Sequence, residues 1–289
     1  MRSIPPSELL IHDDGSAFHL RLRPEQLASR VILVGDPARV AAVAGYFDST
    51  ECEASNREFR SVTGLFRGKR LTVVSHGIGT DNIDIVLTEL DALANIDFSS
   101  RCLRPRLRQL TLVRIGTSGS LQASLPMGSW VAAEKSIGFD GVLYFYAGNA
   151  AVRDRELETE FLRGLPWQLP GVVPYVVNAD ASLLEQIARE DIPRGLTIAA
   201  NGFYGPQGRE VRLALADPGL NRRLEAFRYG ERRITNYEME SSALAGLSAL
   251  MGHRALTVCC IIADRWGRKA DPSAHPTLSR LIETVLNRI

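Results

Sequence analysis

The chain has 289 residues, enough for one large α/β domain or two small ones. Hydrophobic residues make up 45% and charged residues 23%, which is ordinary for a globular protein, and no apolar run approaches the roughly 20 residues that cross a bilayer. The net charge of +1 carries no sign of a nucleic-acid-binding surface, so we expect neither nucleic acid nor a membrane as a partner.

The chain begins with an irregular stretch over residues 1–29, of which 1–16 form an N-terminal arm. The following run, RVILVG over 30–35, is β-branched and apolar and ends in glycine, which predicts a buried strand. Asp36 and Pro37 then predict the start of a helix, with aspartate as the cap and proline in the first turn.

Strands and helices continue to alternate through the middle of the chain. The run 71–75 predicts a strand, and a helical pattern follows over 81–94. The segment 95–109 is polar and rich in arginine, as is typical of a connection. A third strand is predicted over 110–116, followed by the small-residue loop 117–120.

The second half of the chain repeats this alternation. Strands are predicted near 129–138, 172–178, 195–200 and 254–263, and helices near 180–189, 238–252 and 276–288. The sequence shows no repeat and no long linker. The pattern favours one α/β layered sheet over residues 1–289, without an internal boundary.

Two glutamates in the stretch NYEMESS (236–242) are the most informative feature of the sequence. Glu238 and Glu240 stand two residues apart, between a strand-like lead-in and a helical pattern. Residues two apart share a face in extended chain but not in a helix, so both acids reach one pocket only if the strand continues to them. A carboxylate accepts a hydrogen bond from each hydroxyl of a vicinal diol, which suggests a ribose. The alternative is two exposed acids at a helix start, where they suit the helix dipole.

Three predicted strands end in small-residue loops that have an arginine nearby. These are Gly35 with Arg39, the turn around Gly77, and Arg114 with Thr117. Ligands of open α/β sheets collect at the carboxyl ends of strands, and arginines with free helix N–H groups suit a phosphate. Solvation at the surface is the alternative for each arginine, but three loops together favour a phosphate site. Their glycine spacing fits neither the dinucleotide nor the P-loop fingerprint.

The loop FYGPQGR (203–209) has what recognition of a nucleobase needs. Phe203 can stack on a base, Gln207 offers a donor and an acceptor in one plane, and Arg209 adds donors beside them. Such a pair matches a ring with carbonyls flanking an N–H, such as uracil. The alternative is a surface turn, which glycine and proline favour.

The remaining motifs argue against a metal and against oxidised cysteines. The five histidines show no HxxxH or HExxH spacing, so we expect no catalytic metal. The four cysteines show no CxxC pairing, and the first residues lack the basic region and apolar core of a signal peptide. We therefore expect buried, reduced thiols in a cytoplasmic protein.

Together these segments resemble the nucleoside phosphorylase family, most closely its uridine phosphorylase branch, from about Phe18 to the C terminus. The resemblance is carried by FHL (18–20), GDPAR (35–39), NREF (56–59), GIG (77–79), VRIGTSGS (113–120), FYGPQGR (203–209) and NYEMES (236–241). It implies a single α/β domain whose central mixed, partly barrel-like sheet is flanked by helices. It also implies a homo-oligomer with a dimer as its minimal unit, commonly a hexamer, and no cofactor, with inorganic phosphate as co-substrate.

The resemblance further implies reversible phosphorolysis, in which uridine and phosphate give uracil and ribose 1-phosphate. It assigns phosphate binding to Gly35, Arg39, Arg114 and Thr117, with Arg57 contributed by the partner subunit. It assigns ribose binding to Glu240, Met239 and Glu238, with His19 of the neighbouring subunit near the 5′ hydroxyl. It assigns the base to Phe203, Gln207 and Arg209, and the last two would also stabilise the charge that develops on uracil.

Three departures from the family pattern keep alternatives open. Proline and glycine are exchanged within FYGPQGR, and the 95–109 segment is longer than in compact members of the family. Asp264 stands where uridine phosphorylases usually carry asparagine. It is either a general acid for a purine or the partner of Arg265, and we favour the pairing. The alternatives to uridine phosphorolysis are a purine or broad-specificity nucleoside phosphorylase, a hydrolytic nucleosidase, and a nucleoside-binding protein without activity.

Overall fold

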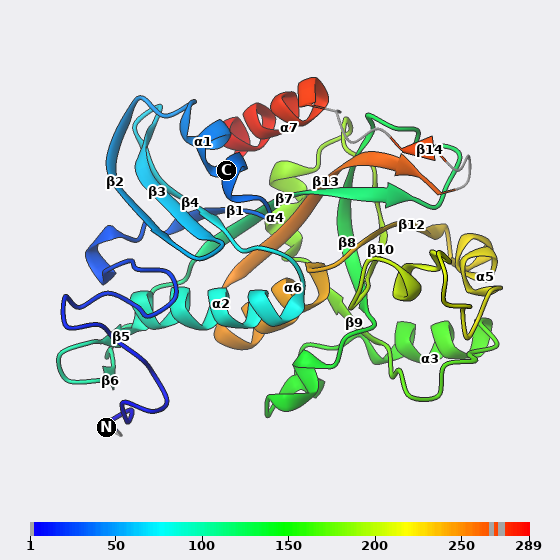
Figure 1. Cartoon of the computed structure of the whole chain (residues 1–289), viewed down its shortest axis with the longest axis horizontal. Coiled ribbons are helices and arrows are strands. Elements are labelled where there is room, and N and C mark those ends of the chain that lie inside the picture. Colours follow the sequence, from blue (N-terminus) through cyan, green and yellow to red (C-terminus); the bar gives the residue numbers. More distant parts are fainter. Residues whose placement is uncertain (1–2, 266–268, 271–274) are drawn as a thin grey trace.

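The computed structural model describes residues 3–265, 269–270 and 275–289, and helices pack on both faces of one large sheet (Figure 1). Its strands are β1 (Arg30–Val34), β2 (Ser49–Asn56), β3 (Phe59–Phe66), β4 (Lys69–Ser75), β5 (Ile96–Asp97), β6 (Cys102–Leu103), β7 (Thr111–Ser120), β8 (Trp130–Gly138), β9 (Tyr175–Asn178), β10 (Arg194–Ala199), β11 (Arg228–Tyr229), β12 (Arg232–Glu238), β13 (Arg254–Asp264) and β14 (Lys269–Ala270). Its helices are α1 (Pro37–Ala44), α2 (Thr80–Asn95), α3 (Arg155–Gly164), α4 (Ala181–Ile187), α5 (Leu220–Ala226), α6 (Ser241–Met251) and α7 (His275–Arg288), with short 3-10 helices η1 (Pro24–Gln26), η2 (Val142–Phe145), η3 (Asn149–Ala151) and η4 (Gly205–Gln207).

The sheet has both parallel and antiparallel pairings. Its strand order is β11–β12–β10–β8–β13–β7–β1–β4–β3–β2, and β12 also pairs with β7. That second pairing, of Asn236 with Ser120 and of Tyr237 with Gly119, closes β12, β10, β8, β13 and β7 into a ring. Because β1 runs parallel to both β4 and β7, the ends of these strands lie side by side. The predicted mixed, partly barrel-like sheet is confirmed.

Helices cover both faces of the sheet because its central strands are apolar on both sides. Along β1, Val31 and Leu33 pack with α2 and α6, whereas Ile32 and Val34 pack with α1, α4 and α7 on the opposite face (Figure 1). Successive side chains of a strand point to opposite faces, so a continuous apolar run is what a doubly covered strand requires. A third apolar cluster joins α3 and α5 to β8, β10 and β12.

The strands and helices that were predicted are found to within a few residues, with one correction at the end of β7, whereas β2, β3, α3 and α5 were not predicted. The sequence predicted that this strand stops at 116 and that 117–120 form a loop, but β7 continues through Ser120. Two neighbours hold it extended, since β13 pairs with β7 as far as Ser120 and β12 pairs with its last two residues. The small side chains of this stretch therefore lie on a strand.

The N-terminal arm and the 95–109 segment lie together at one end of the molecule (Figure 1). The segment contains the two-stranded hairpin β5–β6, and Cys102 of this hairpin forms an isolated bridge with Ser3 of the arm. The sequence predicted an irregular connection here. The hairpin forms because Ile96 pairs with Leu103 and Asp97 with Cys102.

All four cysteines are free thiols. Cys259 and Cys260 are buried as predicted, but Cys52 and Cys102 are only half-buried, because they lie on the sheet edge and on the small hairpin. Within the residues that the structure describes, no helix combines the length and the apolar character that a membrane span requires.

Candidate active site

One cavity brings together nearly all of the predicted site residues. It has a volume of about 1350 Å³ and lies where β1, β4, β7, β12 and β13 end. Eleven of the thirteen predicted residues line it: Gly35, Arg39, Arg114, Thr117, Phe203, Gln207, Arg209, Glu238, Met239, Glu240 and Asp264. His19 and Arg57 lie outside it. The sequence pattern therefore located a real cavity.

The end of β1 and the start of α1 form one wall of the cavity. The Asp36 side chain accepts a hydrogen bond from Ala38 N at 2.8 Å and caps α1, with Pro37 in the first turn, as predicted. Gly35 lies against the neighbouring turn, because a Cβ at this position would come within 3.3 Å of Gly77 O. The helix N-terminus and two glycine backbones thus open onto the cavity, which is a favourable setting for an anion.

Arg39 is a partly buried cation whose side chain has no direct partner among the described residues. Its side chain makes no ion pair or hydrogen bond with any residue that the structure describes, although it is largely shielded from solvent. Burial lowers the pKa of Arg39, and the positive charge of Arg114 lowers it further. The negative charge of Asp36 offsets these effects only in part, so a guanidinium in these surroundings attracts an anion.

Arg114 lies on β7, and each of its three guanidinium nitrogens contacts another side chain. Its Nη1 contacts Glu238 Oε2 at 3.0 Å and its Nη2 pairs with Glu240. Its Nε donates to His76 Nε2 at 3.2 Å, and its Nη1 also donates to Cys259 Sγ at 3.7 Å. Burial alone would lower the pKa of Arg114, but the two carboxylates outweigh it and raise that pKa.

The two predicted glutamates converge on Arg114 and differ in their remaining contacts. Glu238, the last residue of β12, accepts hydrogen bonds from Glu240 N at 2.9 Å and from the backbone N–H and hydroxyl of Ser241. It thereby caps the start of α6. Glu240 accepts from Gly79 N at 2.8 Å, which ties α6 to the glycine turn. The strand reaches Glu238 as predicted, whereas Glu240 lies beyond its end, at the N-cap of α6.

The other end of the cavity holds the loop 203–209. The Arg209 guanidinium lies 3.7 Å from the centre of the Phe203 ring and donates to the Gln207 side-chain oxygen. Burial, followed by the charge of Arg265, lowers the pKa of Arg209 to about 10. Gln207 is buried and Phe203 is exposed at the rim. An aromatic face, an amide and a cation are therefore assembled in one place.

Comparison with known proteins identifies the family. The family model described as the phosphorylase superfamily matches residues 29–287. The chain belongs to the phosphorylase superfamily. The nucleoside phosphorylase family predicted from the motifs is thus confirmed, and with it the class of enzyme.

Similar proteins of this superfamily are uridine phosphorylases. The chain is 27% identical to that of Thermococcus kodakarensis over 261 residues, which is 88% of this chain and 79% of the relative. It is 28% identical to that of Haemophilus influenzae over 256 residues, or 86% of each chain. The crystal structure of a Trypanosoma brucei nucleoside phosphorylase described as showing uridine phosphorylase activity superposes with a TM-score of 0.87, at 28% identity, over 97% of this chain and 100% of that one.

Three further residues of this superfamily site escaped the sequence analysis. His76 is fully buried behind Arg114, and burial followed by the charges of Arg114 and Arg39 holds its pKa well below the usual value. Asn221 donates to Gln207 O at 3.2 Å and accepts from Tyr237 OH at 2.9 Å. Tyr237 lies inside the NYEMES motif, and His76 beside the glycine turn, so both had a local signal. Asn221 had none.

The expected pairing of Asp264 with Arg265 does not form between these two described residues. Arg265 instead donates to the backbone oxygens of Gln207 at 2.8 Å and Gly208 at 3.2 Å. Arg265 is the first residue after β13, and its guanidinium is taken up by these backbone oxygens of the 203–209 loop. Asp264 keeps its place on the cavity wall.

His19 and Arg57, the two residues outside the cavity, were predicted to act on the neighbouring subunit's site. Arg57 is exposed in the tight turn between β2 and β3, with a left-handed φ of 54°. The His19 ring lies 2.7 Å from Glu89 Oε1 through its Nδ1. Both are thus held at the surface of the chain that carries them.

Among the described residues, no group of three or more histidine, cysteine, aspartate or glutamate side chains is arranged to hold a metal ion.

Proposed function

We propose that this phosphorylase catalyses the reversible phosphorolysis of uridine to uracil and ribose 1-phosphate. The observation that carries the proposal is the order of groups along one cavity. Arg39 and Arg114 line it beside Glu240, which pairs with Arg114, whereas Gln207 of the Gln207–Arg209 pair is bound by Arg265, whose side chain lies against Gly119, five residues beyond Arg114 on β7. Phosphate, ribose and uracil follow one another in the same order. The uridine phosphorylases among its relatives support the same substrate.

The phosphate would bind at the end formed by Gly35, Arg39, Arg114 and Thr117. The charge of Arg114 is balanced by the two carboxylates that contact it, and Asp36 lies close enough to Arg39 to offset part of its charge. A phosphate dianion therefore needs more positive charge than this part of the chain provides. We propose that Arg57 of a second protomer supplies it, within a homodimer that is the minimal unit of a hexamer. The four free thiols support the cytoplasm as the setting.

The ribose would bind across Glu240 and Met239. Glu240 now pairs with Arg114, so binding exchanges this ion pair for hydrogen bonds from the 2′ and 3′ hydroxyls and for an Arg114–phosphate contact. Glu238 stays behind them, because its oxygens already hold the start of α6 and Arg114. His19 of the second protomer would accept a hydrogen bond from the 5′ hydroxyl.

The chemistry at the base end is electrostatic. The bond between C1′ and N1 breaks, and its electron pair goes to uracil. Arg209 and Gln207 stabilise the resulting anion with donors already in place. A phosphate oxygen, held below the sugar, forms the new bond to C1′ of the cationic sugar, and the proton that the hydrogen phosphate loses on becoming the ester passes through water to the uracil anion. Holding the reactants in line can account for several kcal/mol of the barrier.

A purine nucleoside is the second candidate substrate, because Asp264 lines the cavity close to the base end. A carboxylic acid there would protonate a purine ring as it leaves. The buried Gln207 and the adjacent Arg209 favour uracil over this alternative.

Ultraviolet-monitored base release tests the proposal. The purified protein is given uridine, thymidine, inosine and adenosine, each with and without inorganic phosphate. We expect uridine to be cleaved only when phosphate is present. Cleavage of inosine or adenosine in preference to uridine would establish the purine alternative, release without phosphate would establish a hydrolase, and no release from any nucleoside would contradict an enzymatic role.

A further inference from the structure

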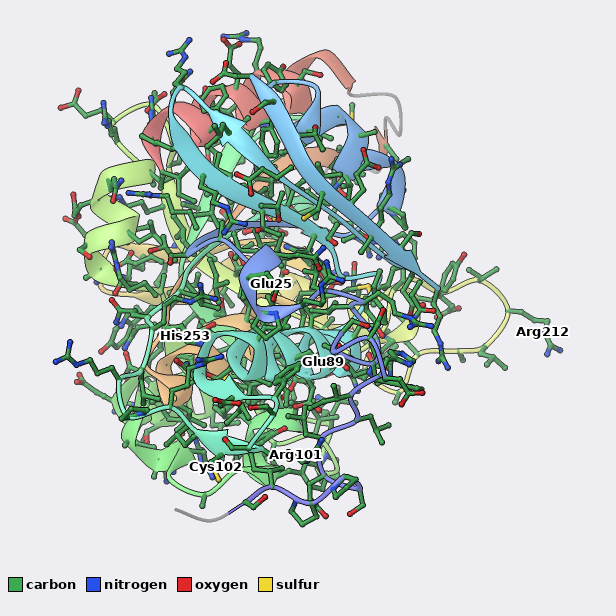
Figure 2. The ribbon with its side chains drawn as sticks, turned by 90° about the vertical axis from the view of Figure 1, so that its left-hand side faces the viewer. Glu25, Glu89, Arg101, Cys102, Arg212 and His253 are labelled. Atoms are coloured by element: carbon green, nitrogen blue, oxygen red, sulfur yellow. The ribbon has the colours of Figure 1, made fainter. Side chains whose placement is uncertain are left out.

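One arginine of the 95–109 segment binds the backbone of the N-terminal arm through hydrogen bonds. Arg101, at the turn of the β5–β6 hairpin, donates from Nε to Ile4 O at 2.8 Å and from Nη2 to Pro5 O at 3.3 Å and to Leu9 O. Its own backbone oxygen accepts from Ile4 N at 2.8 Å. Figure 2 shows Arg101 on this hairpin, beside the arm and on the same side of the molecule as Glu89. One guanidinium thus binds three backbone carbonyls of the arm.

An apolar contact between the arm and the hairpin accompanies these hydrogen bonds. Leu9 of the arm is buried against Ala92 of α2 and Ile96 of the hairpin, with Ile4 and Phe98 packed at the edge. Terminal segments fray unless they are tied down. The hairpin therefore fixes the arm to the end of α2 by both polar and apolar contacts.

The arm leads directly to His19. After a short loop closed by the bridge between Ile11 and Ala17, the chain meets α2 again at Glu89. The Glu89 carboxylate, which is buried, accepts from the backbone N–H groups of His19 and Leu20 and contacts His19 Nδ1. With a proton on Nδ1, the ring presents Nε2 as an acceptor.

Arg101 also has a strained backbone conformation that a glycine in the same turn would avoid. Its φ is 55°, in the left-handed region where glycine is the favoured residue. A glycine here would form the same turn without strain. An arginine at this position therefore contributes through its side chain and not through its backbone. The described hydrogen bonds of that side chain are all with the arm.

We propose that Arg101 is a positioning residue for His19: by fixing the arm, it holds the imidazole where the partner subunit's nucleoside places its 5′ hydroxyl. This inference rests on the proposed function. The long 95–109 segment would then support the site of the neighbouring protomer indirectly, because none of its own residues is proposed to touch the substrate.

Arg101→Gly tests the proposal, because glycine removes the guanidinium and relieves the backbone. Arg67→Gly is the matched control, since Arg67 also has a left-handed φ, of 49°, in an exposed turn away from the arm. We expect Arg101→Gly to lower kcat/KM for uridine between about threefold and tenfold, the size of one hydrogen bond. Activity on 5′-deoxyuridine and the KM for phosphate should stay unchanged. Arg67→Gly should change none of them.

Hydrogen exchange provides a second measurement that needs no activity. The amides of residues 3–22 should exchange faster in Arg101→Gly and at the wild-type rate in Arg67→Gly. Unchanged exchange, an equal loss with both nucleosides, or no loss with uridine would each overturn the proposal. If Arg101→Gly does not fold, Arg101→Lys, which keeps one donor group, should show a smaller loss with the same selectivity.

The same measurements distinguish failure of the proposed function from failure of the positioning role of Arg101. A wild-type protein that releases no base contradicts the proposed function, and exchange alone then decides whether Arg101 fixes the arm. A wild-type protein that cleaves uridine and 5′-deoxyuridine equally well overturns the role of His19, and with it the positioning role of Arg101.

Discussion

Arg39 and Arg114 carry the same charge into the same cavity, but their surroundings prepare them for different tasks. Arg114 has two carboxylates, a histidine and a thiol around its guanidinium. Arg39 has no such partner among the described residues, and burial depresses its pKa. Removing Arg114 would leave two buried carboxylates unpaired and destabilise the fold, whereas removing Arg39 takes away an unfavourable charge.

Arg39→Ala should therefore separate stability from function. We expect the free energy of unfolding to stay the same within about 0.5 kcal/mol or to rise, because no described contact is lost. The KM for phosphate should rise at least about tenfold, the effect of losing one charge-assisted hydrogen bond. Denaturant titration and steady-state kinetics measure the two quantities, with Arg30→Ala, at the exposed start of β1, as the control. An unchanged KM for phosphate would remove Arg39 from the site.

His76 should make stability depend on pH. Its folded pKa is depressed by burial and by Arg114 and Arg39, so below about pH 6.5 the unfolded chain binds a proton that the folded chain does not. Stability is then lost as pH falls. Between pH 7 and pH 5.5 the wild-type protein should lose roughly 1 kcal/mol more than His76→Gln, which keeps an acceptor for Arg114. Equal losses in urea titrations of both proteins would refute this assignment.

A site residue could be predicted where a local sequence pattern indicates its role. It could not be predicted where its role depends on a contact between segments that are distant in the sequence. Glu238 and Glu240 were predictable because their spacing fixes their common direction on a strand. Asn221 was not, because its partner Gln207 lies in a separate loop that the fold alone brings near. The pairing expected for Asp264 is not found between these two residues because Arg265 binds backbone oxygens of the 203–209 loop, which the fold alone brings near.

At the scale of elements, the loop 203–209 depends on what packs behind it. Asn221 and Arg265 both donate to Gln207 O, from α5 and from the end of β13. Gly208 has a left-handed φ of 66°, and a Cβ there would lie 2.5 Å from Asn221 Nδ2. The turn is therefore held by contacts that leave room only for glycine.

Gly208→Ala should damage uridine binding through these contacts. Gly230→Ala is the matched control, because Gly230 has a similar φ of 57° and open space around it. Both substitutions should destabilise the protein by about 1–2 kcal/mol through backbone strain. Only Gly208→Ala should also raise the KM for uridine, by fivefold or more, with the KM for phosphate unchanged. Equal kinetic effects of the two substitutions would count against the role of the turn.

Some features that were not predicted from the sequence, such as the end of β7 and the β5–β6 hairpin, are stabilised by distant partners, whereas the unpredicted β2 and β3 pair with each other across a two-residue turn. The apolar periodicity was enough for β1, α2 and β13, whose cores are continuous. The end of β7 looked like a loop because small residues dominate it, yet β12 and β13 hold it as a strand. The β5–β6 hairpin has no apolar pattern, and contacts with the N-terminal arm support it.

At the scale of the whole molecule, the proposed homodimer would supply the positive charge that the phosphate end of one chain lacks. Two arginines face two glutamates in one chain, and the remaining predicted cation, Arg57, is exposed on the β2–β3 turn. In a two-fold symmetric dimer the same surface serves both partners, so each chain would complete the other's site.

Subunit complementation tests this arrangement. Arg39→Ala and Arg57→Ala should each be nearly inactive at limiting phosphate. After the two are unfolded, mixed in equal amounts and refolded, half of the dimers are mixed, and one of the two sites in each has both arginines. Activity should thus recover to about a quarter of the wild-type value, as the symmetry requires. A mixture of Arg39→Ala with Glu240→Gln, two residues of one cavity, should recover nothing. Recovery in both mixtures, or in neither, would show that Arg57 does not act across a subunit boundary.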